Sequence, residues 1–215
     1  MAIRQDDLGA ETPDDARAVR EREIRDLARA GDLQGAATAA LEQYGAEIFG
    51  FLHALARDDD LAAEAFSGFS EDLWKGLPGF RWDASLRTWS YALARNALHR
   101  LRRDPRRRPR HNVPLSAASK AEQLAEQLRT QTLPFLKTEV KDEVRRLREA
   151  LDPDDHALLV LRIDRKLSWR DIARAMPGDD TTDLDRRAAT LRKRFERAKT
   201  MLRELASKRG LLPTD

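Results

Sequence analysis

The chain has 215 residues, a length that suits one large or two small domains. Charged residues make up 36% and aromatic residues only 6%, and no strand-like alternation persists, so we expect an all-α fold. Cysteine is absent, which excludes disulfides and thiolate metal sites and fits a reducing cytoplasm. No segment approaches the ~18–20 apolar residues of a membrane span, and the acidic N-terminus lacks a signal-peptide core.

The formal net charge of +3 hides a segregation of charge along the chain. Acidic residues gather before about residue 75, whereas arginines gather at residues 81–110 and 186–209. Local basic patches attract nucleic acid more effectively than the total charge does, so these two stretches are candidate nucleic-acid contacts.

Three helices are predicted over the first third of the chain. The first begins with Pro13 at its N-terminus and ends at Gly31, where glycine favours helix termination. Asp32 caps the second helix, and the acids at 58–60 open the third. A Gly-Leu-Pro-Gly run at 76–79 breaks that third helix.

A fourth helix follows, capped by Asp83 or Ser85. Aromatic rings beside arginines suit unstacked single-stranded bases, because a ring offers a stacking face and a guanidinium neutralises phosphate. Trp89 and Leu93 lie on the apolar stripe and are better read as core, whereas Trp82 lies in the loop before the helix. The arginines mostly off the stripe are Arg87, Arg95, Arg100, Arg102 and Arg103.

The C-terminal part has the outline of a helix-turn-helix. Ser168 and Asp171 form a capping-box pattern at the start of a short helix. Over residues 184–205 apolar side chains recur every three or four positions, and the opposite face is basic. A helix-turn-helix places such a second helix in the major groove. A basic amphipathic helix is also a common solvated surface, so the pattern alone leaves both interpretations open.

Two segments together resemble an extracytoplasmic-function sigma factor. The family's region-two pattern, Phe/Leu-Arg-Thr-Trp-x-Tyr-x-x-Ala-x-Asn, is matched at residues 86–96. Its region-four patterns, Leu-Ser-x-x-Asp-Ile-Ala and Thr-Leu-Arg-x-Arg-Phe-x-Arg-Ala-Lys, are matched at residues 167–173 and 190–199. The resemblance covers roughly residues 24–103 and 140–205, in the family's order.

The resemblance implies two small helical domains, a region-two bundle and a region-four helix-turn-helix, joined by a flexible linker. The first would dock on the clamp helices of core RNA polymerase and open promoter DNA at the minus-ten element. The second would lie on the polymerase flap and read the minus-thirty-five element. The implied divisions are a disordered N-terminus at 1–12, the region-two domain at 13–104, the linker at 105–135, the region-four domain at 136–207 and a tail at 208–215.

As a sigma factor the chain would not be an enzyme, and it would need no cofactor and no metal. Its partners would be core RNA polymerase and promoter DNA, without a membrane. An anti-sigma factor that masks both domains is a common partner in the family, and no residue here identifies one.

The resemblance also implies three groups of contact residues. An acidic surface on the third helix would meet core polymerase, although the same acids could simply solvate that helix: Asp60, Glu64, Glu71 and Asp72. The loop at 79–85 would accept a base flipped out of the duplex, whose unstacking costs a few kcal/mol. The predicted minus-ten contacts are Arg81, Trp82, Arg87, Arg95, Asn96 and Arg100. The predicted minus-thirty-five contacts are Arg187, Thr190, Arg192, Lys193, Arg194 and Arg197.

One segment departs from the family. The turn between the two region-four helices is several residues longer than usual, over residues 177–185. We expect Thr182 to cap the second helix with Asp185 at its third position, so that the helix starts about two turns early. Acids near this end would repel phosphate, although a carboxylate can accept from cytosine N4, so an atypical DNA-binding mode is predicted.

Two other classes of function stay open. A helix-turn-helix regulator that acts without polymerase would explain residues 167–205 but not the match at 86–96. A helical enzyme such as a metal-dependent nuclease or hydrolase would need a ligand cluster, and the acids at 58–60 with Glu64 are better explained as a helix start. The histidines are scattered over separate elements: His53, His99, His111 and His156.

Overall fold

The computed structural model describes residues 13–56, 58–104, 146–178 and 183–211. These residues form helices and no strand, which confirms the predicted all-α class. The predicted N-terminal segment 1–12 and linker 105–135 lie outside the described residues. In chain order the elements are α1 (Pro13–Arg29), α2 (Leu33–Ala56), α3 (Asp59–Gly76), η1 (Leu77–Gly79), α4 (Leu86–Arg103), α7 (Pro153–Leu159), η3 (Val160–Asp164), α8 (Trp169–Ala175) and α9 (Leu184–Lys208).

Helices begin where the sequence predicts caps. The side chains of Asp58 and Ser85 each accept a hydrogen bond from the backbone amide three residues on, at 2.6 and 3.0 Å. Ser85, and not Asp83, is thus the cap of α4. Ser168 is the predicted cap of α8 and accepts from the amide of Asp171 at 3.1 Å. Its hydroxyl also donates to the Asp171 carboxylate at 2.5 Å, whereas a full capping box would use the backbone amide of the cap residue.

The end of α1 also follows the sequence. Gly31 has a φ of +84°, a left-handed conformation that a side chain with a Cβ disfavours. Asp32 accepts from the amide of Gly35 at 2.8 Å and caps α2 immediately afterwards. The two helices therefore reverse direction within a very short connection and pack along each other.

Helices α1 to α4 form the N-terminal half, and α2 is its most buried element. Aromatic rings join α2 to its neighbours: Phe49 lies edge-on to Phe66 of α3 at 5.6 Å, and Phe51 lies edge-on to Tyr91 of α4 at 5.0 Å. Burial of each such ring contributes about 2–3 kcal/mol, so these contacts position α4 firmly against α2.

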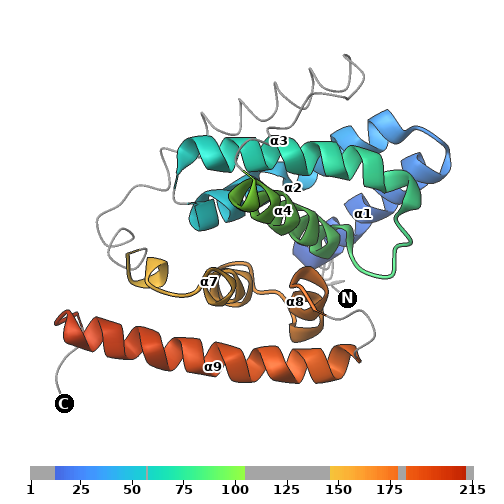
Figure 1. The fold of residues 1–215 in the computed structure, drawn as a ribbon. Helices are drawn as coiled ribbons and strands as arrows, with labels where there is room; N and C mark the ends of the chain where they lie inside the picture. The colour runs from blue at the N-terminus through green and yellow to red at the C-terminus, as the bar shows by residue number, and fades with distance from the viewer. Residues whose placement is uncertain (1–12, 57, 105–145, 179–182, 212–215) are drawn as a thin grey trace, which may run out of the picture.

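Helices α7, α8 and α9 form the C-terminal half, which packs on the N-terminal half in the described chain. Figure 1 shows α4 with α2 and α3 on one side and with α7 and α8 on the other, while α9 lies outermost. Buried residues of both halves belong to one continuous hydrophobic cluster. The two predicted domains are thus in direct contact here.

A π-helical turn, η3, links α7 to the segment before α8. The amide of Arg165 donates to the carbonyl of Val160 at 3.0 Å, five residues earlier. Lys166 then has a φ of +55°, and the chain turns into α8. This geometry carries the backbone and side chain of Arg165 to the surface of α2 and α4.

Candidate nucleic-acid interface

The basic face predicted for α9 is present. Ala188, Phe195 and Ala198 are buried against α7 and α8, as the apolar stripe predicts. Arg192, Lys193 and Arg197, all predicted to contact DNA, are exposed. Thr190 is also exposed, and its hydroxyl donates to the carbonyl of Arg186 at 3.0 Å. The exposed face of α9 thus offers several cations to a polyanion.

Two other predicted contacts on α9 are bound to the protein itself. Arg187 donates to the carbonyl of Met176 at 2.9 Å, which ties α9 to the end of α8. Arg194 forms ion pairs with Asp152 at 2.9 Å and with Asp155 at the start of α7. Partial burial acts to lower the pKa of Arg194, but the hydrogen bond and charge of Asp155 outweigh it and raise the pKa. Both arginines therefore have a structural role that the sequence did not predict, and their DNA contacts stay a prediction.

Trp169 at the start of α8 packs against the middle of α9. Its ring lies edge-on to Phe195 at 5.3 Å. The guanidinium of Arg162 lies over the ring at 4.8 Å, and that of Arg192 at 5.5 Å. Cation–π contacts of this kind orient the cation, so Trp169 positions the predicted DNA contact Arg192.

The start of α9 corrects one detail of the sequence analysis. Asp183 caps the helix, because its side chain accepts from the amide of Asp185 at 3.0 Å. Thr182, the predicted cap, lies outside the described residues. The helix begins at Leu184, within two residues of the predicted start. Asp185 pairs with the exposed Arg170 of α8 at 3.0 Å, so part of the acidity at this end is neutralised.

The loop between η1 and α4 is built on aromatic stacking. Phe80 stacks on Trp89 of α4, with ring centroids 4.4 Å apart and planes at 12°. Trp82 packs on the ring of Phe80 at 4.8 Å, and Arg25 of α1 lies over Trp82 at 5.5 Å. Trp82 has a φ of +61°, a left-handed conformation that costs a non-glycine residue about 1–2 kcal/mol. The surrounding contacts offset this strain and fix the loop.

A pocket of about 500 Å³ lies beside this loop. Its wall includes Phe80 and Trp89, and it is bordered by three cations, Lys75 of α3, Arg81 of the loop and Arg174 of α8, together with the carboxylate of Asp83. Its size is in the range of small-ligand sites, and the combination of rings and cations suits a planar group that carries negative charge. Trp82 supports the loop from the side of α1 and is not among the residues that line the pocket.

The remaining predicted minus-ten residues divide into exposed and interior ones. Arg81 is 87% exposed and lies 3.5 Å from Asp83. Asn96 is exposed on α4. Arg100 is bound to Asp72 of α3, so two residues that were predicted to contact different partners contact each other.

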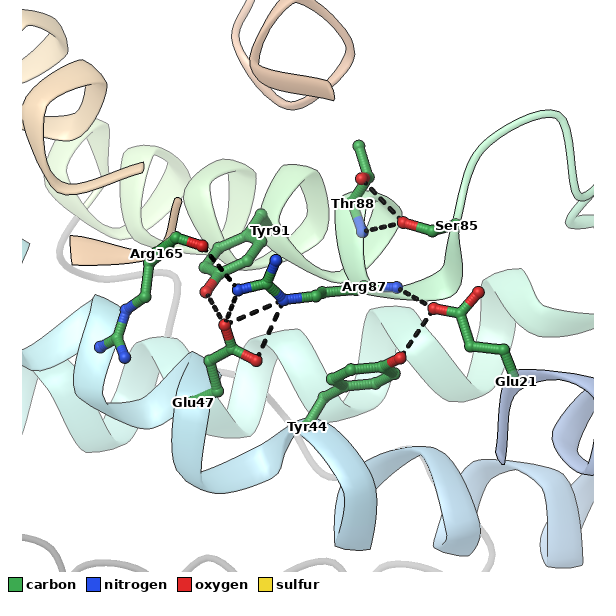
Figure 2. Close-up of polar contacts among 8 residues, drawn as sticks. All are labelled: Glu21, Tyr44, Glu47, Ser85, Arg87, Thr88, Tyr91 and Arg165. Carbon is green, nitrogen blue, oxygen red and sulfur yellow. Dashed lines mark hydrogen bonds and ion pairs between the residues drawn. The ribbon is translucent and has the colours of Figure 1, made fainter. Parts of the chain in front are cut away.

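Arg87 lies in the interior, in the cluster that Figure 2 shows. Its Nε donates to Glu47 Oε1 at 3.0 Å, its Nη2 to the carbonyl of Arg165 at 2.8 Å, and its backbone amide to Glu21 at 3.0 Å. The hydroxyl of Tyr91 donates to the same Glu47 oxygen at 2.6 Å. The contacts of Arg87 therefore join α1, α2 and the turn before α8.

The charges in this cluster stabilise one another. Burial acts to raise the pKa of Glu47, but hydrogen bonds from Arg87 and Tyr91 and the charges of Arg87 and Arg165 lower it overall. Burial acts to lower the pKa of Arg87, and the hydrogen bond to Glu47 raises it overall. Burial and the charge of Glu47 raise the pKa of Tyr91, so its hydroxyl stays a donor. Glu47 and Arg87 are thus held ionised inside the fold.

Arg95 is the other interior arginine of α4. Its side chain is only 10% exposed and pairs with Asp154 of α7. Arg95 is buried and the side chain of Arg87 is only 16% exposed in this arrangement, although both were predicted to contact DNA. Those DNA assignments stay predictions that require a different arrangement of the two halves.

The acids predicted for the polymerase contact lie along α3. Asp60 is exposed at its start, and Glu64 is half-buried one turn later. Glu71 pairs with Lys75 on the same helix, and Asp72 with Arg100. Of these four acids, Asp60 at the start of α3 is the most exposed.

The partners that sequence reasoning missed are Glu47, Arg165 and Asp154. Glu47 had a detectable signal, because it lies three residues after Tyr44 and four before Phe51 on the apolar face of α2. A carboxylate in that position requires a buried cation. No comparable pattern marks Arg165, whose role depends on the π-helical turn.

No protein-family model matches this sequence, and no curated protein sequence matches it. Over the described ranges no helix has the length and apolar character needed to cross a membrane. Nor does that part of the chain gather three or more histidine, aspartate or glutamate residues where they could hold a metal ion.

Proposed function

We propose that this chain is a sigma factor, a cytoplasmic and non-enzymatic subunit that binds core RNA polymerase and directs promoter-specific initiation. The observation that carries the proposal is the pocket walled by Phe80 and Trp89 beside the loop that precedes α4. This loop directly precedes residues 86–96, which match the family's promoter-melting pattern.

In the proposed reaction a minus-ten base leaves the duplex and enters this pocket. Unstacking the base costs a few kcal/mol, and stacking on an aromatic ring returns about 1–3 kcal/mol. Arg81 is exposed at the rim of the pocket and neutralises a neighbouring phosphate. Opening is thus driven by binding energy, and no cofactor or nucleotide hydrolysis is required.

The second contact is made by α9 at the minus-thirty-five element. Its exposed face presents Arg192, Lys193 and Arg197 to the major groove. Arg192 is held over Trp169, so its guanidinium is partly ordered before DNA binds. A shorter connection after α8 would start α9 several residues later. Because α9 begins at Leu184, its first turn reaches beyond that position, and this favours a tilted approach of the helix to the major groove.

Core polymerase is proposed to bind the acidic end of α3, through Asp60 and Glu64 and then toward Glu71 and Asp72. Acidic side chains on an exposed helix suit a basic partner helix. The region-two and region-four domains would then act at separate places on the enzyme, which requires the segment between them to span that distance.

Association with core polymerase is the decisive measurement. Purified chain is mixed with core enzyme, and run-off transcription is measured on a library of genomic fragments. We expect a stable complex and initiation at a small set of sites. A helix-turn-helix regulator that acts alone would bind DNA without core enzyme and would not restore transcription. Absence of any association with core polymerase contradicts the proposal.

A substitution at the rim of the pocket distinguishes promoter melting from the binding of core polymerase. Arg81→Ala should reduce open-complex formation about tenfold while binding of core enzyme is unchanged, because one phosphate contact and the rim charge are lost. Arg20→Ala is the matched control, since Arg20 is an exposed arginine of α1 that pairs with Glu23 of the same helix at 3.0 Å. Equal open-complex yields from both variants would show that Arg81 does not contribute to promoter melting.

A further inference from the structure

Two exposed side chains of opposite charge meet where α8 and α9 come together. The Nε atom of Arg170, on the first turn of α8, lies 3.0 Å from Oδ1 of Asp185, on the first turn of α9, and the side chains are 63% and 67% exposed. An ion pair so open to water contributes little to the stability of a fold. It lies at the end of α9 that a helix-turn-helix directs toward the bases. Its position therefore favours a role in DNA binding over a role in stability.

The geometry of this pair suits an arginine that reads a base. Arginine carries one N–H on Nε and two on each Nη atom, all in one plane. With the carboxylate at Nε, N–H groups of Nη1 and Nη2 remain at the end of the side chain. Such a pair of donors matches O6 and N7 of guanine, which are exposed in the major groove. A carboxylate at Nε can therefore orient Arg170 and still leave it two donors for a base.

Other contacts hold the start of α9 beside α8. Nη2 of Arg187 donates to the carbonyl of Met176, at the end of α8, at 2.9 Å. A Cβ on Gly178 would lie 2.6 Å from the same guanidinium, so the chain that leaves α8 passes directly against Arg187. Asp185 lies two residues before Arg187 in the same helix. Its position relative to α8 is therefore fixed.

A second arginine is held by the neighbouring residue of α8. Trp169 precedes Arg170 in the chain, and the guanidinium of Arg192 lies over its ring at 5.5 Å. Asp185, Ala189 and Arg192 share one face of α9, because they are four and three positions apart. Ala189 is exposed and carries only a methyl group, so α9 can approach the bases closely between the two arginines. The first turn of α8 thus orients two arginines along one face of α9.

We propose that Arg170, oriented by Asp185, reads a guanine in the major groove and adds a specificity-determining residue from α8 to the contacts of α9. The proposal rests on the proposed function, because it deepens the reading of promoter DNA by α9. Asp185 is a positioning residue, which holds the guanidinium and does not itself contact a base. This role accounts for an acidic side chain at an end of α9 that approaches phosphates. Holding the arginine before binding also reduces the rotamer entropy that is lost when DNA binds.

Reading of a base and binding of a phosphate differ in what a substitution removes. A bidentate pair of arginine with guanine discriminates against the wrong base by about 5- to 150-fold. A phosphate contact carries no sequence information, so its loss weakens binding to all sequences alike. Lysine keeps the charge of arginine but does not present a planar pair of donors. Replacement of Arg170 by lysine therefore distinguishes the two kinds of contact.

The test is selection from a randomised duplex library by the full chain, once with core polymerase and once alone. For the wild-type chain we expect guanine at one position, favoured by about 5- to 150-fold. Arg170→Ala and Arg170→Lys should both lose that preference and keep the preferences at other positions. If Arg170→Lys instead selects the same sequences as the wild-type chain, Arg170 contacts phosphate, and the reading of guanine is overturned.

Asp185→Ala tests the positioning role. It should weaken the guanine preference at the position that Arg170→Ala abolishes, although the loss of an acid favours binding to every sequence. A fall in sequence preference without a fall in overall affinity is not expected from a residue that only stabilises the fold. If Asp185→Ala abolishes the preference at a different base pair, Asp185 contacts a base itself, and the positioning role is overturned.

Arg20 and Glu23 of α1 supply the matched controls, because their ion pair also measures 3.0 Å and the arginine is 65% exposed. Arg20→Ala and Glu23→Ala should select the same sequences as the wild-type chain, and circular dichroism should show equal helix content for all variants. If the chain does not associate with core polymerase, the sigma assignment fails, while selection by the chain alone still decides the role of Arg170. A wild-type chain that selects no guanine in either experiment overturns the proposal.

Discussion

Arg87 and Glu47 form a charged pair inside the helical packing, with Arg87 Nε 3.0 Å from Glu47 Oε1 and 3.2 Å from Oε2. Their side chains are 16% and 22% exposed. Two charges in such a place lose much of their hydration, and the pair is stable because hydrogen bonds replace part of the lost water. Tyr91 and the carbonyl of Arg165 supply two of those bonds.

Glu47→Ala should therefore destabilise the chain by about 2–4 kcal/mol, because it leaves the Arg87 guanidinium and the Tyr91 hydroxyl without their acceptor. Urea unfolding followed by circular dichroism measures the change. Glu23→Ala is the control, since the pair of Glu23 with Arg20 is exposed and should cost under about 1 kcal/mol. Equal losses in the free energy of unfolding for both variants would contradict a larger contribution from the Arg87–Glu47 pair.

The pH dependence of stability follows from the lowered pKa of Glu47. A carboxylate whose pKa is lower in the folded chain contributes stability that is fully present above its unfolded pKa, which is near 4.5. That contribution is lost as pH falls through the folded value. The difference in melting temperature between the wild-type chain and Glu47→Gln should thus be constant from about pH 8 to 5 and shrink in acid. A difference that instead grows in acid would contradict the sign of the shift.

Trp169→Ala should destabilise the packing of α8 on α9 by about 2–3 kcal/mol, because it removes a half-buried ring and the surface on which Arg162 and Arg192 lie. Trp169→Phe keeps an aromatic face and should recover more than half of the loss. Urea unfolding of both variants gives the comparison. Should the alanine variant prove as stable as wild type, Trp169 does not order Arg192.

Alanine substitutions of Arg197 and Arg194 should have different effects, one mainly on DNA binding and the other mainly on stability, although both residues lie on α9. Arg197 is exposed, whereas Arg194 is held by the aspartates at the start of α7. Arg197→Ala should reduce the slope of log affinity against log salt by about 1 and leave stability unchanged. Arg194→Ala should cost about 1 kcal/mol of stability and change the slope little. Gel shifts at four salt concentrations measure the slopes. A larger slope change for Arg194→Ala than for Arg197→Ala would indicate that Arg194 contacts DNA.

Local features of the fold were predictable from the sequence because their causes are local. Asp58, Ser85 and Ser168 cap helices through amides a few residues away, and a glycine at position 31 ends α1 by its own backbone conformation. The apolar stripe predicted for α9 is confirmed in part: Ala188, Phe195 and Ala198 are buried. Its leucines are only half-buried, and Ala206, which is not on the stripe, is buried.

The roles of the α4 arginines were not predictable in the same way. Arg87 and Arg95 lie off the apolar stripe, which suggested solvent, but their partners are 78 and 59 residues away in sequence. The spacing of apolar residues along α4 carries no information about a carboxylate or carbonyl that the C-terminal half of the chain places beside that helix. Only Glu47, a carboxylate among buried aromatic residues, gave a sign that a cation is required.

The π-helical turn at η3 has a consequence for how this chain tolerates changes in length. Each residue of an α-helix advances the direction of side chains by about 100°. Deleting one residue between Val160 and Asp164 would convert the turn to ordinary α geometry and rotate the following backbone by that angle relative to α7. The carbonyl that Arg87 contacts would then point elsewhere. A single-codon deletion at this turn should be far more damaging than substitutions there that preserve size and polarity.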